Sequence, residues 1–239
     1  YGSGSSMQYA TINATNTIVG LTGTSAAASA ITSANSTQNI DMSAVGTLGA
    51  GASVNTLRYT GAAGTLAGNL TTNGLMNAGS GALTLNGTVT IGSTRELVVT
   101  AANNDITISG VLQDNGGGAS SLLVSNPAST STTQGLTLSN NNTYSGGTTI
   151  SNNRLSITAN NALGTGNVTV LRGNIGASVA EYGGQLDVSN NITWSNNMTL
   201  AGQGYNAYSG ALRSSGGNNT HTGTITITDG LTRISSAAG

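Results

Sequence analysis

Short runs of alternating apolar and polar residues extend along most of this chain, and clusters of Asn, Gly and Ser separate them. The clearest stretch is 135–170, with the sequence GLTLSNNNTYSGGTTISNNRLSITANNALGTGNVTV. Alternation with a period of two is typical of half-buried β-strands, and Asn/Gly clusters are typical of tight turns. The pattern therefore predicts short strands in this stretch at 136–138, 148–150, 155–157 and 168–170.

The same pattern predicts strands over the rest of the chain, whereas no segment shows an apolar stripe of period 3.6 over three helical turns. The Ala-rich segment 25–35, SAAASAITSAN, favours a helix by composition but lacks a broad apolar face, so a loop or an end cap is an equal alternative. Over the whole chain, with slightly wider bounds for three of the strands named above, the strand candidates are 9–12, 17–21, 56–59, 82–85, 88–91, 96–100, 105–111, 121–125, 136–139, 154–158, 167–171, 185–189, 197–200, 211–214, 224–228 and 231–235.

Many short strands with regular turns suit an antiparallel sandwich or barrel as well as a solenoid. Short Thr-rich strands, scarce aromatic residues and recurrent Asn-rich turns favour the solenoid, because a sandwich core of this size normally uses large aromatic side chains. We predict an all-β chain that forms a single right-handed parallel β-helix over 1–239, less regular over 1–60. About 20 residues per coil give about a dozen coils and a rod about 55–60 Å long, with Asn or Thr ladders at its corners.

Composition narrows the function classes. The 239 residues carry a formal net charge of −1, and all six basic residues are Arg. Such sparse charge offers no patch for nucleic acid and no polybasic segment for an anionic membrane. The absence of Cys excludes disulfides and thiolate metal sites, and the sequence contains no apolar run of about 18 residues that predicts a transmembrane helix.

The stretch 135–170 resembles the passenger-associated β-strand repeat of bacterial autotransporters. The match includes the segments LTL at 136–138, NTYSGGTTI at 142–150 and NALGTG at 161–166. One departure is Asn153-Arg154, which stands where the family usually has Gly-Thr before the leucine of the next strand. The structural repeat motif comprises Leu136, Leu138, Asn142, Tyr144, Gly146, Gly147, Ile150, Leu155, Leu163, Gly164 and Gly166.

The resemblance implies a segment of a longer passenger domain that is exported across the outer membrane and is secreted or held at the cell surface. Segments at 95–99, 105–108, 210–220 and 232–234 are similar to coils that flank the repeat in such proteins. The expected function is structural: a building block of a bacterial cell-surface or extracellular fibre, stalk or adhesin. We expect partners to be further coils of the same protein or other copies joined end to end, with surface glycans as a further candidate.

Candidate catalytic residues are few, and we predict no enzyme, cofactor or metal site. His221 is the only histidine, so one chain cannot form a two-His metal site, and we expect a solvent-facing turn residue. Asp105 with Asp114, or Glu181 with Asp187, could form the carboxylate pair of a polysaccharide-degrading β-helix. The acids are scattered, however, and Asp105 is expected in a turn at 103–105. Dense carboxylates for calcium are also absent.

A glycan-binding module is the other alternative. Tyr205 and Tyr208, with Trp194 nearby in sequence, suggest a sugar-stacking patch, although an aromatic cap on an insertion between coils is favoured. The Thr-x-Thr runs at 88–90 and 224–228 resemble flat ice-binding faces. Such faces need the same outward Thr pair on many coils, and we expect these runs not to be aligned.

Overall fold

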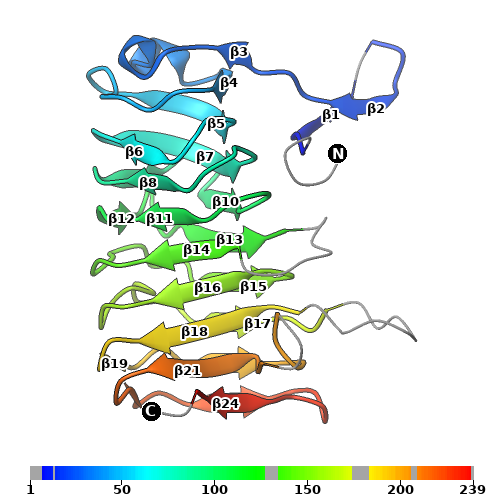
Figure 1. Ribbon diagram of the computed structural model, residues 1–239, viewed down its shortest axis with the longest axis vertical. Helices are drawn as coiled ribbons and strands as arrows, with labels where there is room; N and C mark the ends of the chain where they lie inside the picture. Colours follow the sequence, from blue (N-terminus) through cyan, green and yellow to red (C-terminus); the bar gives the residue numbers. More distant parts are fainter. Residues whose placement is uncertain (1–6, 13, 127–133, 174–182, 206–208, 238–239) are drawn as a thin grey trace.

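The computed structural model describes residues 7–12, 14–126, 134–173, 183–205 and 209–237, and the regular secondary structure of these residues is almost all β-strand (Figure 1). Within those ranges the helical structure consists of two single 3-10 turns, η2 (Ala28–Ala30) and η3 (Ser33–Asn35). The predicted all-β class is therefore confirmed. The first two strands, β1 (Ala10–Ile12) and β2 (Ile18–Gly20), form an antiparallel hairpin, and every other strand pairing is parallel.

Two long parallel sheets stack the rest of the chain along one axis, and we call them sheet 1 and sheet 2. Sheet 1 follows the order β3 (Thr24–Ser25), β4 (Asn39–Met42), β5 (Ser53–Tyr59), β7 (Leu70–Asn77), β10 (Glu96–Thr100), β13 (Ser121–Ser125), β15 (Thr148–Ser151), β17 (Val168–Val170), β20 (Met198–Leu200) and β23 (Ile225–Ile227). Sheet 2 follows the order β6 (Gly64–Leu66), β8 (Leu83–Leu85), β11 (Ile106–Ile108), β14 (Gly135–Leu138), β16 (Arg154–Ile157), β18 (Gln185–Ser189), β21 (Leu212–Gly216) and β24 (Ile234–Ser236).

A third side joins the two sheets and carries short strands in some layers. From β8 onward the chain repeats one order: a strand of sheet 2, the third side, and a strand of sheet 1, which together make one layer. The strands of the third side are β9 (Val89–Ile91), β12 (Leu112–Gln113), β19 (Thr193–Trp194) and β22 (Thr220–His221). This arrangement of stacked parallel layers is compatible with a β-solenoid.

The core consists of inward rows in which apolar residues of successive layers lie directly above one another. In sheet 2, Ile106 pairs with Leu136, Leu136 with Leu155, and Leu155 with Leu186. All four side chains are fully buried. Since strands in a sheet lie about 4.8 Å apart, each residue in a row packs on a similar residue above and below it.

The sequence distance between paired residues varies, although the register is kept. Ile150 pairs with Val170, twenty positions further on, and Val170 pairs with Leu200, thirty positions further on. The connections from sheet 1 to sheet 2 account for most of this difference in sequence: two residues separate β15 from β16, whereas fourteen separate β17 from β18. The estimate of a dozen coils is therefore wrong for the described part: sheet 1 has ten strands along its path, which span about 43 Å at normal strand spacing.

Strand prediction succeeded where alternation was clean, as at 96–100, 121–125 and 185–189. It missed several strands of the first half, among them β4, β6 and β7. The strand β7 contains Asn73 and Gly74, which normally mark turns. Here Asn73 lies where the chain bends from the third side into sheet 1, and the outer side of Gly74 faces the Tyr9 hydroxyl.

An asparagine ladder supports that bend, as the corner prediction expected. The Asn55 amide donates to Asn39 Oδ1 at 2.9 Å, and the Asn73 amide donates to Asn55 Oδ1 at 3.0 Å. Thr94 continues the ladder through its hydroxyl, which donates to Asn73 Oδ1. Each polar corner group is thus satisfied by the layer beside it.

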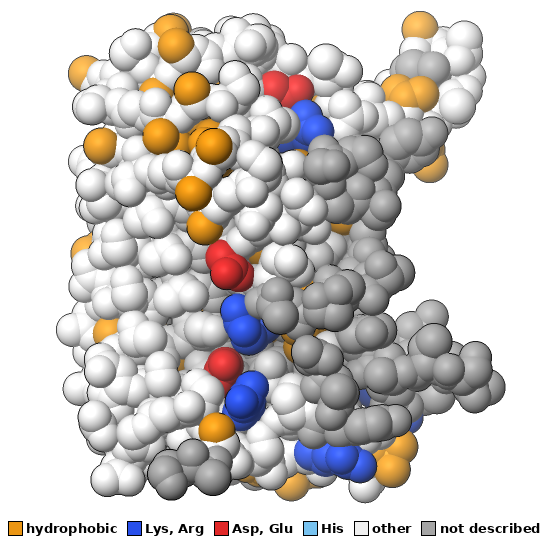
Figure 2. Space-filling view, viewed as in Figure 1, with side chains coloured by type: hydrophobic (Ala, Val, Ile, Leu, Met, Phe, Trp, Pro, Cys, Tyr) orange, Lys and Arg blue, Asp and Glu red, His pale blue; other side chains and the backbone are white. Residues whose placement is uncertain are grey.

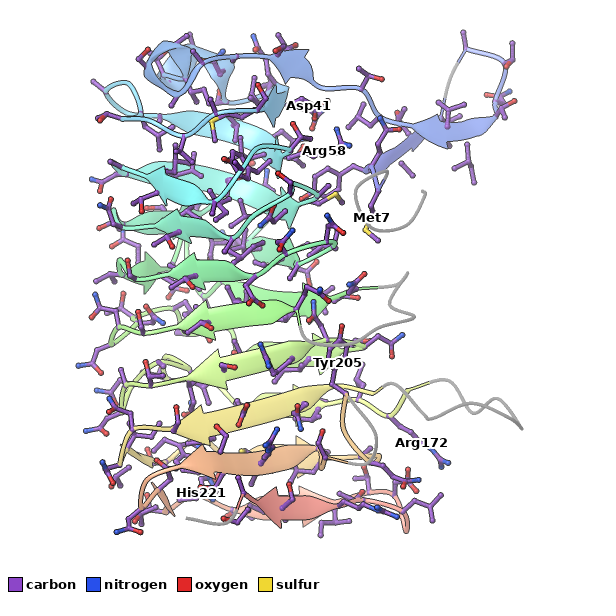
Figure 3. All side chains as sticks on the ribbon, viewed as in Figure 1. Met7, Asp41, Arg58, Arg172, Tyr205 and His221 are labelled. Carbon is purple, nitrogen blue, oxygen red and sulfur yellow. The ribbon has the colours of Figure 1, made fainter. Side chains whose placement is uncertain are left out.

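The N-terminal end of the stack is closed. Ala28 of η2 and Ile31 are buried against the core, and the Thr32 hydroxyl and the Asn35 side chain form a capping box. The segment 25–35 is therefore an end cap without an α-helix. Before it, Arg58 donates from Nε to the Met7 carbonyl at 2.8 Å and holds the start of the chain on the outer face of sheet 1 (Figure 3).

The C-terminal end is open. Ile227 continues the inward row of Ile150, Val170 and Leu200, yet it is 57% exposed while Leu200 is fully buried. Ile234 in β24 is 53% exposed for the same reason, because no described layer covers it. The two ends of the stack therefore differ: the N-terminal end is covered by a cap, and the C-terminal end exposes apolar side chains of the inward rows.

These rows give a stability prediction. Ile150→Ala should lower the free energy of unfolding by about 3 kcal/mol, because layers on both sides enclose the cavity that it creates. Ile227→Ala, in the same row, should cost less than about 1 kcal/mol, because its side chain is already half exposed. Denaturant unfolding followed by far-UV circular dichroism measures both. Equal losses for the two variants would contradict the described burial.

Candidate functional site

The repeat motif supplies both core residues and corner residues. Five of its apolar side chains are fully or almost fully buried in the core: Leu136, Leu138, Ile150, Leu155 and Leu163. Asn142 and Tyr144 lie on the third side and are also buried. The glycines occupy the bends, where Gly147 has φ 93° and Gly164 has φ 58°.

Asn142 bonds to layers on both sides of its own. Its Oδ1 accepts the backbone N–H of Leu112 from the preceding layer at 2.8 Å, and its Nδ2 donates to the Ala162 carbonyl of the following layer at 2.6 Å. Its own N–H donates to the Asn161 carbonyl. A buried amide with these partners satisfies backbone groups where the third side has no regular strand pairing.

Tyr144 and Gly164 fit together at the same side. The Tyr144 hydroxyl lies 2.6 Å from the Thr148 hydroxyl, and burial raises the pKa of Tyr144 well above its usual value. A Cβ at Gly164 would collide with the Tyr144 carbonyl, and its positive φ disfavours other residues. Gly164 is therefore required by backbone contact between layers.

Asp114 holds the bend before β15, a role that sequence analysis did not find. Its Oδ1 accepts backbone N–H groups from Ser120 and Ser145, and its Oδ2 accepts the Ser145 hydroxyl at 2.6 Å. Burial alone would raise the pKa of Asp114. The hydrogen bonds from Ser145 and Ser120 lower this pKa by more than burial raises it, so the pKa lies below its ordinary 3.8.

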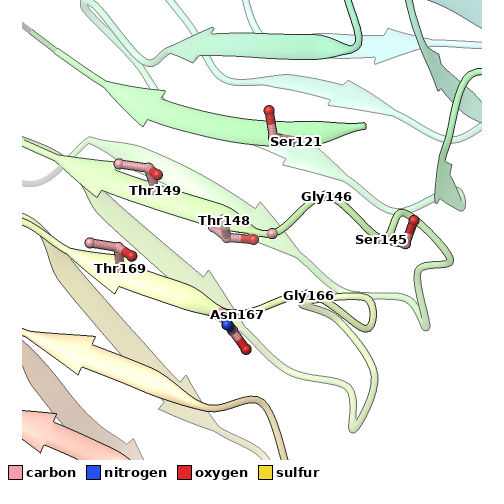
Figure 4. Close-up of a pocket in the computed structure, with 9 residues that line it drawn as sticks. Ser121, Ser145, Gly146, Thr148, Thr149, Gly166, Asn167 and Thr169 are labelled. Atoms are coloured by element: carbon pink, nitrogen blue, oxygen red, sulfur yellow. The ribbon is translucent and has the colours of Figure 1, made fainter. Parts of the chain in front are cut away.

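A polar groove lies on the outer face beside this bend (Figure 4). Its volume is about 390 Å³, and it runs across the starts of β13, β15 and β17. Gly146, Gly147 and Gly166 leave the hollow, and its remaining lining residues are all Ser, Thr or Asn. The motif glycines thus shape the surface as well as the backbone.

The Thr-x-Thr runs at 88–90 and 224–228 are not aligned with each other, since Thr90 pairs with Thr71 and Gln113 whereas Thr226 pairs with Thr199. Single outward Thr residues nevertheless form columns. On sheet 1, Thr149 pairs with Thr169, then Thr199, then Thr226. On sheet 2, a second column joins Thr65, Thr84, Thr107 and Thr137. Alignment follows strand register and not sequence spacing. The sheet 1 column has no second Thr column beside it, because the position two residues before Thr169 and Thr199 is an Asn.

Asp105 and Asp114, the first candidate acid pair, are held by structural partners. Asp105 lies before β11, as the turn prediction expected, where it accepts the Gly135 N–H and pairs with Arg154 at 3.6 Å. Asp114 is committed to Ser120 and Ser145. Asp187 is almost fully buried beside Arg213 of the next strand, and residue 181 lies outside the described ranges. Figure 2 shows acidic and basic side chains beside one another on the face in view. Arg58 links to Asp41 of the neighbouring layer, and Arg154 reaches Asp105 across the layer of β14.

The expected aromatic residues do not form an exposed strip. Trp194 and Tyr205 are buried, and residue 208 lies outside the described ranges (Figure 3). Trp194 packs on His221 with ring centroids 4.9 Å apart. His221 lies in strand β22 and is partly buried, and its Nε2 lies 2.9 Å from the Asn196 carbonyl. The prediction of a solvent-facing turn residue is therefore wrong.

The described residues contain no group of three His, Cys, Asp or Glu side chains that could hold a metal ion. No helix in the same part of the chain is long and apolar enough to cross a membrane. Comparison of the chain with family models, with curated proteins and with solved structures gives no match.

The Gly164 bend gives a second prediction. Gly164→Ala should destabilise the fold by about 2 kcal/mol or more, because it combines positive φ with a clash against the Tyr144 carbonyl. Gly116→Ala is the matched control, since nothing lies within 4 Å of its added Cβ and its φ is not positive. Thermal melting of both variants checks this, and equal melting temperatures would contradict it.

The Asp114 bend predicts a pH dependence. A carboxylate whose pKa is lowered on folding stabilises the fold above the unfolded pKa, and this contribution is lost as the pH falls through the folded pKa, below about 3.8. Asp114→Ala should therefore lower the melting temperature at pH 6 and differ less from the wild type near pH 3. A difference of the same size at both pH values would contradict a role for the carboxylate charge.

Proposed function

We propose that this chain is a structural building block, a right-handed parallel β-solenoid within a bacterial cell-surface or extracellular fibre, stalk or adhesin. The observation that supports this best is the continuous parallel pairing of the two sheets, through ten strands of sheet 1 and eight of sheet 2, with a register shift after Val188 between β18 and β21. A core of continuous rows resists bending, because displacing one layer separates rows in both sheets at once. The resemblance of 135–170 to the passenger-associated repeat supports the same function.

The course of the chain supports the right-handed sense. In Figure 1 the front strands of sheet 2 run to the left, the rear strands of sheet 1 run to the right, and the chain descends from the blue end to the red end. A path that descends in this way supports a right-handed coil.

The open end supports association along the axis. Ile225, Ile227 and Ile234 expose inward rows there, and the edge strands β23 and β24 present unpaired backbone groups. A further layer would bury the rows and pair the edges, whether it comes from the same protein or from another copy.

Location at the cell surface, after export across an outer membrane, is part of the same proposal. The absence of Cys and the low charge support it, because a chain without disulfides and with few charges can cross a membrane unfolded and fold outside. Polysaccharide cleavage is less well supported. The two carboxylates of a glycosidase face one substrate, whereas Asp105 and Asp114 are bound to separate structural partners.

Electron microscopy of the native material tests this function. We expect stiff rods or fibres with an axial repeat, and dispersed compact particles at high concentration would contradict the proposal. Sedimentation of the chain isolates the role of the open end. Ile227→Asp should weaken concentration-dependent association at least tenfold, because a charge would enter the buried row.

Thr199→Asp is the control for that measurement, because Thr199 lies on the outer face of the same sheet. It should leave association unchanged. Equal weakening by both substitutions would place the contact on the outer face instead of at the end of the stack.

A further inference from the structure

The groove beside the bend at Gly146 is a fixed consequence of layer packing. A Cβ at Gly146 would meet the backbone of Ser120, and a Cβ at Gly166 would meet the backbone of Gly147. Gly147 itself has φ 93°. These positions therefore exclude larger side chains, and the outer surface stays hollow across three layers (Figure 4).

Some polar groups of this groove are already used by the fold. The Thr148 hydroxyl bonds to Tyr144, and the Ser145 hydroxyl bonds to Asp114. Three other lining side chains differ. Thr149, Thr169 and Asn167 make no side-chain hydrogen bond to any described residue, and all three are partly or fully exposed. They offer two hydroxyls and one amide to a ligand.

The chemistry of the groove selects a neutral ligand. No lining residue is charged, so a phosphate or an acidic sugar would find no cation there. Nor is any lining residue an aromatic or a large aliphatic, which argues against an apolar ligand. Hydroxyl and amide groups both donate and accept, as do the hydroxyl groups of sugars. We propose that this groove and the column of Thr149 and Thr169 bind a neutral polysaccharide.

The column also indicates how a chain-like ligand would lie. Thr149, Thr169, Thr199 and Thr226 follow one another at the strand spacing of about 4.8 Å along the axis. A polymer placed along the axis meets the same type of group at each layer, starting from the groove. Repeated weak contacts then add, so a polymer is held far better than a single sugar.

Affinity electrophoresis tests the site. The full chain is run in native gels that contain dextran, mannan, amylose or a β-1,3-glucan, with polygalacturonate as the acidic comparison. At least one neutral polymer should retard the chain. The double variant Thr149→Val and Thr169→Val should weaken the apparent dissociation constant by about 25-fold, at about fivefold for each hydroxyl.

The matched control is Thr84→Val with Thr107→Val, an equivalent outward pair on sheet 2. This pair should keep the wild-type retardation, and circular dichroism should give the same spectrum for all three proteins. No retardation by any neutral polymer, retardation by polygalacturonate alone, or equal loss in both double variants would each overturn the proposal. Asn167→Ala adds a second measurement, with an expected weakening of about fivefold.

Discussion

Parallel pairing of each layer with the layers beside it is the constraint on which this structure depends. Backbone hydrogen bonds in both sheets run along the axis, so no strand is satisfied within its own layer. The same pairing places Leu136 over Leu155 and Ile150 over Val170, which makes the core a set of continuous rows. A chain with few aromatic residues can form a dry core in this way, because like side chains of moderate size fill a narrow interior.

The corners show the cost of this arrangement. Wherever the chain leaves a strand, its backbone groups lose their regular partners, and side chains must replace them. Asn142 does this between three layers, and Asp114 does it at the bend before β15. Glycine is required for a different reason. At Gly164 the backbone of one layer approaches that of another so closely that no Cβ fits. The abundance of Asn and Gly in the composition is thus a result of stacking.

Sequence reasoning found the class of fold because alternation and turn residues are local signals. It placed the rows correctly at 96–100 and 121–125, where polar and apolar residues alternate cleanly. It missed β7, since Asn73 and Gly74 look like a turn but form a bend within one strand. It did not find the columns of single outward Thr residues, because register depends on strand pairing across connections of different length. The role of Asp114 depends on Ser145, thirty-one positions away, and no local pattern reveals it.

The same constraint explains where binding chemistry can lie. Inward positions must fit their rows, and corner positions must satisfy the backbone, so only outward positions are free to vary. Some of these positions carry ion pairs that link layers, such as Arg58 with Asp41, whereas others carry Thr149 and Thr169, which bond to no other described side chain. A groove that layer packing already keeps open needs no further reorganisation to receive a ligand. A structural rod can therefore acquire a ligand-binding face through a few outward substitutions, without a change in its core.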